Sequence, residues 1–355
     1  MSGRRLTVWL LLAGILAGCG GDTPAAERKA EWIRDAYATI ASGRYPRLKA
    51  VAWWHENFDR VRLRIDSSPA ALDAYRSAIA DPAFVTEPVI AQGKLQTPSR
   101  GVYVAAFPDF CGPEDCVNHE RIADFESLAG RPVAWAYFSN NGFDPASGDP
   151  RIAFPWAAVE TIDAAGRLPF VRLMLRSRLD QGQPDPVYAL QAIIDGDFDA
   201  ELTAWADDAS AWGKPLLAEF GTEVNGEWFP WNGLHNGGGT RDGFGDPGRA
   251  DGPERFVAAY RHIIDLFRSS GVDNITWFFH VNDDSEPVAD WNRIARYYPG
   301  DNYIDWIGVS IYNGVWVRDE DVDFLDLMDR VWPRLTALSP SRPIALLELG
   351  MDEQP

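Results

Sequence analysis

The sequence predicts an α/β fold in the form of a (β/α)8 TIM barrel, and three observations lead to this class. From about residue 99 onward, short apolar runs alternate with amphipathic stretches, as in a parallel sheet covered by helices. The apolar runs are hydrophobic along their whole length, as strands buried on both faces are. The chain has 355 residues, 46% of them hydrophobic, which suffices for one barrel of roughly 250 residues with additions.

Seven strands are expected in this part of the chain, with helical segments between most of them. The clearest helix follows Pro253, has apolar residues at helical spacing and ends at Gly271. A closed barrel needs eight strands, and an open barrel would leave an unpaired edge, so one unit is missing. The strands are expected at residues 101–107, 132–139, 169–175, 214–220, 274–281, 304–311 and 343–349.

The front of the chain offers the missing unit. Residues 27–43 are expected to form an amphipathic helix, 48–54 a strand, and 68–80 a helix that Ser68 caps. This helix–strand–helix unit would close the barrel between the last and the first of the seven strands. Residues 85–98 show no clear period and are expected to be a connector. The alternative is a separate N-terminal subdomain.

The N-terminus carries the pattern of an export signal. A basic start with Arg4 and Arg5 is followed by an apolar run that is too short to span a bilayer. The run ends in Leu-Ala-Gly-Cys, which looks like a bacterial lipobox. We therefore expect residues 1–18 to be removed and Cys19 to carry lipid, with the protein anchored to the cell envelope. Gly20 favours the outer membrane. An ordinary signal peptide with an incidental cysteine is the alternative.

The two remaining cysteines are Cys111 and Cys116, five positions apart in a loop. Export implies an oxidising compartment, so we expect a local disulfide, with two free thiols as the alternative. A zinc site is not expected, because only His119 is nearby and the chain has no second cysteine pair. Neither a metal nor a cofactor is expected elsewhere.

The chain is strongly acidic, with a formal net charge of −19. Such a surface would repel a phosphate backbone, which argues against nucleic acid as a partner. Acidity does not identify a substrate. The chain also has 15 tryptophans, some of which can stack on ligands although most are expected in the core. We expect a monomer.

The richest motif is residues 219–233, EFGTEVNGEWFPWNG. It begins at the end of an expected strand, and the active site of a parallel barrel lies at the carboxyl ends of its strands. Glu223 stands where a general acid would be, and Asn225 can bind a sugar hydroxyl. Trp228 and Trp231 can offer flat faces to sugar rings. A loop so rich in aromatic residues is unfavourable in water without a ligand.

The second motif is residues 343–350, PIALLELG, in which Glu348 closes an apolar strand. Burying a carboxylate there costs several kcal/mol unless it is paired or used. Two glutamates at strand ends of one barrel are what glycoside cleavage needs, because one protonates the leaving oxygen and the other attacks the anomeric carbon. A separation of about 5–5.5 Å would give retention of configuration. The sequence therefore predicts a polysaccharide hydrolase.

These motifs resemble glycoside hydrolase family 26, the family of β-mannanases and their relatives. The run EVNGEWFPW is similar to its acid/base motif, RPIALLELG to its nucleophile strand, and YYPGDNYIDWIGVSIY to its sixth strand. The resemblance covers most of residues 99–355. It implies a retaining mechanism with Glu223 as acid/base, Glu348 as nucleophile and Tyr312 as the residue that orients Glu348.

Residues 29–84 resemble the C-terminal end of the same family, with Trp53 at the tryptophan that floors the sugar site. The resemblance therefore implies a circular permutation in which Pro355 lies near the start of the first helix. The expected organisation is a signal peptide at 1–18, a tether at 19–28 and a single barrel at 29–355, made of the permuted unit 29–84, the linker 85–98 and strands one to seven in 99–355.

The chain departs from the family pattern before the acid/base. Mannanases of the family usually carry Arg and His four and one residues earlier, whereas this chain has Glu219 and Thr222. Alternation places Glu219 on the same side as Glu223, where Arg172 or Arg176 would compensate its charge. Mannan as the substrate is therefore open. His280, at the end of the fifth strand, either contacts substrate or caps the strand.

Three functions fit these residues. The first is an endo-acting β-glycanase on mannan or a related β-linked polysaccharide. The second is a non-catalytic sugar-binding lipoprotein on a decayed barrel, which would need only the aromatic residues and not both glutamates. The third is an enzyme that trims the exopolysaccharide of the cell itself.

Overall fold

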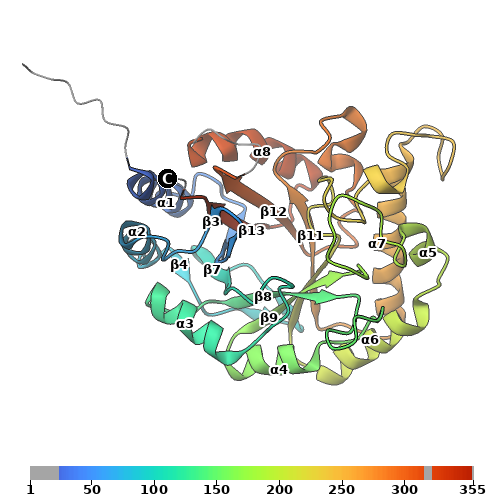
Figure 1. The fold of residues 1–355 in the computed structure, drawn as a ribbon, viewed down its shortest axis with the longest axis horizontal. Coiled ribbons are helices and arrows are strands. Elements are labelled where there is room, and N and C mark those ends of the chain that lie inside the picture. The colour runs from blue at the N-terminus through green and yellow to red at the C-terminus, as the bar shows by residue number, and fades with distance from the viewer. Residues whose placement is uncertain (1–23, 316–321, 354–355) are drawn as a thin grey trace, which may run out of the picture.

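The computed structural model describes residues 24–315 and 322–353 and shows a closed barrel of eight parallel strands ringed by helices (Figure 1). The strand order around the barrel is β1, β13, β12, β11, β10, β9, β8, β7, and β1 also pairs with β7, which closes the ring. The strands are β1 (Leu48–Trp54), β7 (Val102–Phe107), β8 (Trp135–Asn141), β9 (Leu168–Met174), β10 (Leu216–Phe220), β11 (Ile275–Asn282), β12 (Trp306–Asn313) and β13 (Ile344–Met351). The predicted fold class is confirmed.

The helices lie on the outside of the barrel (Figure 1). Five further strands have only two residues each. The helices are α1 (Ala25–Ala41), α2 (Pro69–Ile79), α3 (His119–Ala129), α4 (Trp156–Ala164), α5 (Leu190–Ile194), α6 (Asp199–Trp212), α7 (Asp251–Ser269) and α8 (Phe324–Leu338). The short strands are β2 (Asn57–Phe58), β3 (Val61–Arg62), β4 (Phe84–Val85), β5 (Ile90–Ala91) and β6 (Lys94–Leu95). No helix among the described residues is long and apolar enough to cross a bilayer.

The N-terminal unit is part of the barrel. Strand β1 lies between β13 and β7, with Leu48 opposite Ile344 and Trp54 opposite Phe107. The expected pairing of residues 48–54 with the last and first of the other strands is confirmed, so these residues do not form a separate subdomain. The expected lipobox at Cys19 and the expected position of Pro355 lie outside the described residues.

Helices α1 and α2 complete the outer ring between α8 and α3 (Figure 1). Trp32 of α1 packs edge-on against Phe324 of α8, with ring centroids 5.7 Å apart. Tyr37 of α1 meets Tyr75 of α2 at 5.5 Å. Helix α2 begins at Pro69 because the Ser68 side chain accepts the backbone N–H of Ala71 and proline suits the first turn.

A buried lysine, Lys29, links the N-terminal unit through hydrogen bonds to the C-terminal end of the described residues. The Lys29 ammonium on α1 donates to the carbonyls of Arg62 (2.7 Å) and Arg64 (2.9 Å) and to the Ser67 hydroxyl (2.8 Å). Ser67 in turn donates to Glu353 at 2.7 Å. Burial lowers the pKa of Lys29 to about 7, although Glu353 and two other nearby carboxylates oppose the shift.

The segment 85–98 differs from the expected connector. It folds into the β5–β6 hairpin, which covers the N-terminal ends of the barrel strands. The Leu95 backbone N–H donates to Thr276 of β11 at 2.8 Å, its carbonyl accepts from the Trp306 indole at 3.4 Å, and Lys94 pairs with Asp305 at 2.8 Å. Two-residue strands are too short to show a period in the sequence, which is why this hairpin was missed.

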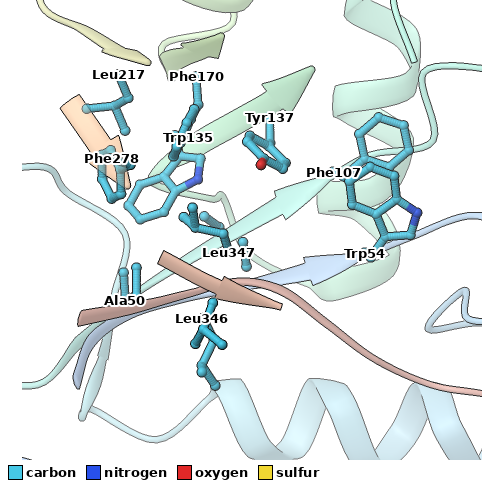
Figure 2. Close-up of a cluster of buried hydrophobic side chains, with 14 of the residues drawn as sticks. Ala50, Trp54, Phe107, Trp135, Tyr137, Phe170, Leu217, Phe278, Leu346 and Leu347 are labelled. Atoms are coloured by element: carbon cyan, nitrogen blue, oxygen red, sulfur yellow. The ribbon is translucent and has the colours of Figure 1, made fainter. Parts of the chain in front are cut away.

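The barrel interior is filled with large apolar side chains. Figure 2 shows Trp135, Phe170 and Phe278 gathered inside the strands, and all three are fully buried. The rings of Phe170 and Phe278 are 4.7 Å apart. This part of the interior is therefore a packed core, and polar chemistry is confined to the layer nearer the carboxyl ends of the strands.

Candidate active site

Glu223 and Glu348 lie at the carboxyl ends of β10 and β13, the end of the barrel where loops and catalytic groups meet. Both are buried, with 7% and 4% of their surface exposed. Glu223 stands three residues beyond β10 in a turn with φ of 50°, in the left-handed region that non-glycine residues rarely adopt. Such strain is typical of functional positions.

A register shift turns Glu348 toward the interior. Val309 of β12 pairs with Leu346, but the next residue, Ser310, pairs with Glu348, so β13 holds one extra residue at this point. Leu347 already points into the barrel (Figure 2), and regular alternation would send Glu348 outward. The bulge places Glu348 on the same face as Ser310. Bulges of this kind are frequent beside active sites because they re-aim a side chain.

The two oxygens of Glu348 have different surroundings. The Tyr312 hydroxyl donates to Oε2 at 2.7 Å, which agrees with the orienting role that the family resemblance implies for this tyrosine. Oε1 lies 3.2 Å from Nη2 of Arg172 but accepts no hydrogen bond of good geometry from the described residues. One oxygen is thus fixed, and the other keeps a lone pair available while a cation stabilises the negative charge.

Glu223 has neutral hydrogen-bond partners. The Trp228 indole N–H donates to its Oε2 at 2.7 Å, and the Ser310 hydroxyl is hydrogen-bonded to the same carboxyl group. Trp228 was expected to contact sugar, and it also holds the carboxyl that would donate the proton. Gly221 makes the turn possible, because a Cβ at this position would lie 2.3 Å from the Phe256 ring.

Burial and mutual repulsion determine the protonation of the pair. Burial raises the pKa of Glu223. Burial and the neighbouring Glu223 carboxylate raise the pKa of Glu348 to about 8, against the opposing effect of Arg172. Two carboxylates that repel each other in this way hold one proton between them at neutral pH. Arg172 lowers the pKa of both carboxyls, and it contacts Glu348 directly, with Nη2 3.2 Å from Oε1.

Arg172 of β9 is the central cation of the site, and only 2% of it is exposed. Besides Glu348, it pairs with Glu114 and lies 3.5 Å from Glu219. The rings of Trp54 and Tyr137 flank its guanidinium at 5.1 and 5.2 Å. An arginine inside an apolar strand is the signal that identifies it in the sequence. Arg172 or Arg176 was expected to compensate the charge of Glu219, and Arg172 is the one that lies beside it, whereas Arg176 donates to Asn141.

Glu219 belongs to β10, the strand before the turn that carries Glu223, and is fully buried. It accepts hydrogen bonds from Tyr137 and Thr222 and meets His280 at 2.9 Å. Burial alone would raise the pKa of Glu219, but His280, Arg172 and Thr222 outweigh burial and lower it. Glu219 and Thr222, the two departures from the family motif, are therefore in direct contact, because the Thr222 hydroxyl donates to the Glu219 carboxylate.

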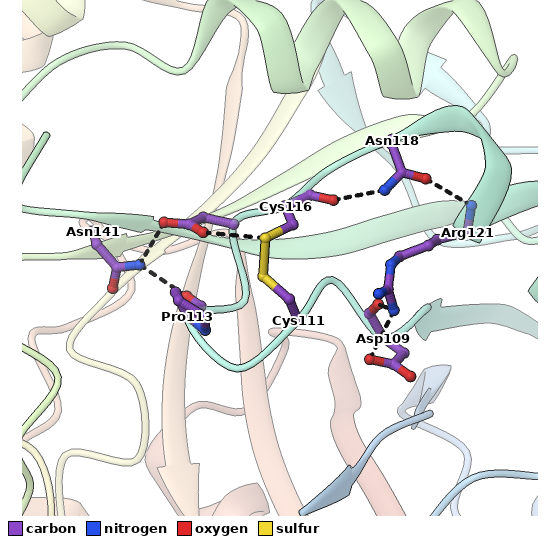
Figure 3. The surroundings of a disulfide bond; sticks show 8 residues. Asp109, Cys111, Pro113, Cys116, Asn118, Arg121 and Asn141 are labelled. Atoms are coloured by element: carbon purple, nitrogen blue, oxygen red, sulfur yellow. Dashed lines mark hydrogen bonds and ion pairs between the residues drawn. A yellow bond between two sulfur atoms is a disulfide. The ribbon is translucent and has the colours of Figure 1, made fainter. Parts of the chain in front are cut away.

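The disulfide between Cys111 and Cys116 holds the loop that carries Glu114 (Figure 3). The sulfurs are bonded, and Glu114 has φ of 63°. Its carboxylate accepts from Ser139 of β8 at 2.6 Å and pairs with Arg172. Burial and Glu114 also raise the pKa of nearby Glu56 to about 8. Glu56 and Glu114 were missed because each is one acidic residue in an irregular loop.

Trp53, which was expected to floor the sugar site, points away from the candidate site, whereas its neighbour Trp54 faces it. The Trp53 indole donates to the Leu63 carbonyl at 2.8 Å, and its ring packs against Tyr75 of α2, outside the barrel. Trp54 points to the opposite face, stacks on Phe107 at 4.0 Å and lies over Arg172. The run LKAVAWW is apolar on both faces, so the sequence does not reveal which tryptophan points inward.

Three further residues expected to contact substrate are instead bonded within the protein. Asn225 is fully buried and donates to the carbonyls of Asn282 (2.9 Å) and Asp284 (3.1 Å). Trp231 is 1% exposed and donates to the Thr222 carbonyl. His280 is fully buried between Glu219 and Ser310. Their hydrogen-bonding groups already have partners within the protein. These groups are therefore not available to a sugar hydroxyl.

Comparisons with known proteins agree with this geometry over part of the chain. Residues 190–340 match the model of glycosyl hydrolase family 26. The chain is 36% identical over 166 residues to Endoglucanase H of Acetivibrio thermocellus, covering 45% of this chain and 17% of that protein. It is 25% identical over 124 residues to Beta-1,3-xylanase TXYA of a Vibrio species, covering 35% and 22%. The chain thus spans less than a quarter of either relative.

Solved structures with which the chain aligns include a family 26 β-mannanase from Bacteroides ovatus, at 14% identity and a TM-score of 0.43, covering 93% of this chain and 77% of that one. A mannanase from Bacillus subtilis aligns at 13% identity and a TM-score of 0.42, covering 93% and 80%. The match to the family 26 model, over residues 190–340, includes the strand and loop that position Glu223.

Proposed function

We propose that this protein hydrolyses a β-linked polysaccharide by double displacement, with retention of configuration. The observation that carries the proposal is the pair Glu223 and Glu348, which share one barrel mouth, where burial raises the pKa of both and the Glu223 carboxylate raises the pKa of Glu348 further. Their surroundings differ in the way the mechanism requires. Glu348 faces a cation, and Glu223 has only neutral hydrogen-bond donors.

In the first step Glu348 attacks the anomeric carbon as the bond to the leaving oxygen breaks, and Glu223 gives its proton to that oxygen. Oε1 of Glu348 is the attacking atom, since it keeps a free lone pair, while Tyr312 holds Oε2. In the second step Glu223 accepts a proton from water as the water attacks the anomeric carbon. The product is released, and the two carboxyls regain their starting protonation.

Two observations support the proposed substrate class, the names of the curated relatives and the residues that precede Glu223. The two curated relatives are named as an endoglucanase and a β-1,3-xylanase. Glu219 and Thr222 replace the Arg and His that family 26 mannanases usually carry, and they bond to each other below the site. We therefore propose an endo-acting enzyme for a β-linked glucan, xylan or mannan. A pocket of about 400 Å³ that includes Ser139, Asn141 and Trp156 adjoins the catalytic layer and offers room for further sugars.

A substrate panel tests this function. Wild-type protein is incubated with mixed-linkage β-glucan, β-1,3-xylan, β-mannan and a bacterial exopolysaccharide, and released reducing ends are measured. Glu348→Gln should lose about a thousandfold or more in rate on any substrate that is cut. Glu227→Gln, which changes an exposed glutamate in the loop that carries Glu223, should not. Wild-type binding without release of sugar from any polysaccharide would favour the non-catalytic lipoprotein instead.

We also propose that the protein is exported and held at the cell envelope by lipid on Cys19. The lipobox-like Leu-Ala-Gly-Cys supports this, and the Cys111–Cys116 disulfide is of the kind that persists in an oxidising compartment. Replacing Cys19 by Ser should move the protein from the membrane fraction to the soluble fraction after cell lysis. An unchanged distribution would contradict the anchor.

We further propose that the chain is a circular permutation of the family 26 barrel, with the eighth β/α unit at the front. Two observations support it. Residues 29–84 resemble the C-terminal end of the family, and β1 lies between β13 and β7.

A further inference from the structure

A second cavity lies at the carboxyl end of the barrel, and its lining includes neither glutamate of the candidate site. Its volume is about 490 Å³, which is within the range of small-molecule sites. Two of its lining residues mark its place, because His55 directly follows β1 and Pro108 directly follows β7. Trp54, the residue before His55, lies beside Arg172, and successive residues of an extended segment point to opposite faces. The cavity therefore lies on the outer side of these two strands, where residues of α3 complete its wall.

His55 brings an unpaired hydrogen-bond donor to this cavity. The residue is 2% exposed, and its Nδ1 accepts the backbone N–H of Ile65 at 3.0 Å. Because an accepting ring nitrogen carries no proton, the proton of the neutral imidazole is on Nε2. Oδ1 of Asp66 lies 3.9 Å from Nε2, too far for a hydrogen bond, and Nε2 has no other partner among the described residues. A buried N–H without an acceptor costs free energy, and a ligand in the cavity would supply that acceptor.

The surroundings of His55 keep its ring neutral and fixed. Burial lowers the pKa of His55, and the Arg64 guanidinium lowers it further, against the opposing effect of Asp66. The ring packs edge-on against Phe125 of α3, with ring centroids 5.0 Å apart. The Nε2–H group is therefore a donor of fixed direction for an uncharged acceptor, such as the hydroxyl or ring oxygen of a sugar.

The charged groups of the cavity do not suit an anionic ligand. Both of its arginines are paired with Asp109, since Arg64 donates to one carboxylate oxygen at 2.7 Å and Arg121 lies 3.0 Å from the other (Figure 3). Two further lining carboxylates, Glu120 and Asp124, are exposed on one face of α3 and have no ion pair or hydrogen bond among the described residues. The cavity thus has free acceptors and one neutral donor, whereas its positive charges already have partners.

A sugar residue fits this set of groups. Its hydroxyls can donate to the carboxylates, and its oxygens can accept the Nε2–H of His55. A polysaccharide repeats the same residues along its length, so one molecule can occupy the catalytic mouth and a second site at the same end of the barrel. Binding at two sites raises the overall affinity for long chains without any change in the chemistry of cleavage.

We propose that the cavity between β1, β7 and α3 is a second carbohydrate-binding site, which holds uncharged sugar residues of a polysaccharide with His55 as donor and Glu120 and Asp124 as acceptors. This inference goes beyond the proposed hydrolase function and rests on it only for the choice of glycans to test. The site takes no part in cleavage, and its effect is on the affinity of the protein for long chains.

Binding is tested in the full chain with Glu348→Gln, by native electrophoresis in gels that contain mixed-linkage β-glucan, β-1,3-xylan, β-mannan or a bacterial exopolysaccharide. His55→Asn keeps an acceptor for the Ile65 N–H and removes Nε2, and Asp124→Arg reverses the charge of an exposed wall residue. Each change should weaken the retardation by the glycan and raise its apparent Kd about tenfold. Asp207→Arg, the same change at an exposed aspartate of α6, should leave the retardation unchanged. With Glu348 restored, the two wall variants should raise KM far more for the polysaccharide than for a short aryl β-glycoside.

The outcomes separate the second site from the proposed function. Retardation that depends on His55 and Asp124 supports the site even if the wild type cuts no polysaccharide, a result that would overturn the hydrolase function alone. Retardation that stays unchanged in either folded variant, or no retardation by any of the four glycans, would overturn the site, whether or not the wild type is active. Thermal unfolding checks that each variant is folded, and the exposed position of Asp124 keeps the test decisive if His55→Asn does not fold.

Discussion

Arg172 is the residue on which the charge balance of the site depends. Its guanidinium contacts three carboxylates, those of Glu114, Glu219 and Glu348. Its fork of donors spans groups that come from different strands and a loop, which a lysine ammonium cannot do in the same way. The two flanking rings of Trp54 and Tyr137 keep it in that position.

Replacing Arg172 by Met should impair catalysis through the nucleophile. Arg172 lowers the pKa of Glu348, which burial and Glu223 raise to about 8, so its loss raises that pKa further. Glu348 must be ionised to attack, and the acidic limb of the kcat/KM profile should therefore move to higher pH, with a loss of about a hundredfold at the optimum. Arg172→Lys should lose less. A Met variant whose pH profile coincides with that of wild type would contradict the role of Arg172.

Trp53 and Trp54 form a matched pair for separating stability from activity. Trp53 is bonded to the Leu63 carbonyl and packed on Tyr75, whereas Trp54 lies beside Arg172. Trp53→Phe should lower the free energy of unfolding by about 1–3 kcal/mol, through the lost hydrogen bond and packing, with kcat/KM unchanged. Trp54→Phe should lower kcat/KM with a smaller effect on stability. Chemical denaturation and kinetics are measured on the same samples. A loss of kcat/KM in Trp53→Phe, with only a loss of stability in Trp54→Phe, would contradict the assignment of the two tryptophans.

At the scale of residues, the sequence predicts the two glutamates of the candidate site and some of their neighbours, such as Tyr312 and Trp228. Glu223 and Glu348 can be found because each ends a strand in a motif. Asn225, Trp231 and His280 also look like substrate contacts, but their partners, such as Asn282 for Asn225 and Ser310 for His280, are far away along the chain. Burial and pairing of this kind become visible only when the strands are placed side by side.

Among the structural elements, the disulfide loop has the most direct effect on the site. Cys111 and Cys116 (Figure 3) bracket Glu114 in the sequence. The Glu114 carboxylate reaches Arg172 and Ser139. Closing so short a loop stabilises the fold by about 2 kcal/mol in the chain-entropy view. The loop is therefore expected to stabilise the protein modestly and to position Glu114 at the same time.

Replacing both Cys111 and Cys116 by Ser should lower kcat/KM more than the small change in stability explains. Without the disulfide, the left-handed turn at Glu114 relaxes and Arg172 loses a partner. We expect a loss of about tenfold in kcat/KM, measured well below the unfolding temperature, and Glu114→Gln should give a similar loss with the disulfide intact. Full activity of the double serine variant would show that the loop does not position Glu114.

At the scale of elements, hydrophobic runs predict all eight barrel strands, while the short hairpins and the bulge are not predictable. The expected strand 48–54 coincides with β1. The β5–β6 hairpin has two residues in each strand, and the bulge in β13 shifts one residue within the continuous run IALLEL. Neither feature changes the hydrophobic pattern, although the bulge decides where Glu348 points.

For the molecule as a whole, the barrel is closed by its own N-terminal unit. Strand β1 hydrogen-bonds to both neighbours, and Lys29 joins α1 to the loop after β3 and, through Ser67, to Glu353. Without this unit, two strand edges, those of β7 and β13, would be exposed. Unpaired edges of that kind lead to aggregation.

Deleting residues 24–84 should therefore prevent folding of the remainder rather than remove a dispensable domain. We expect the shortened chain to aggregate, as measured by light scattering, and to show no cooperative thermal transition. Supplying residues 24–97 as a separate chain during refolding should restore soluble, active protein, because β1 can then pair with β13 and β7. A stable and active shortened chain would show that the barrel does not need this unit.

The central claim, a retaining hydrolase with Glu223 as acid/base and Glu348 as nucleophile, is tested most directly by the configuration of the first product. Proton NMR of the anomeric signals is recorded during cleavage of a β-linked polysaccharide that the enzyme cuts. Double displacement predicts that the β-anomer appears first and that the α-anomer follows only by mutarotation. The α-anomer as first product would mean direct attack by water and would contradict the role of Glu348 as nucleophile.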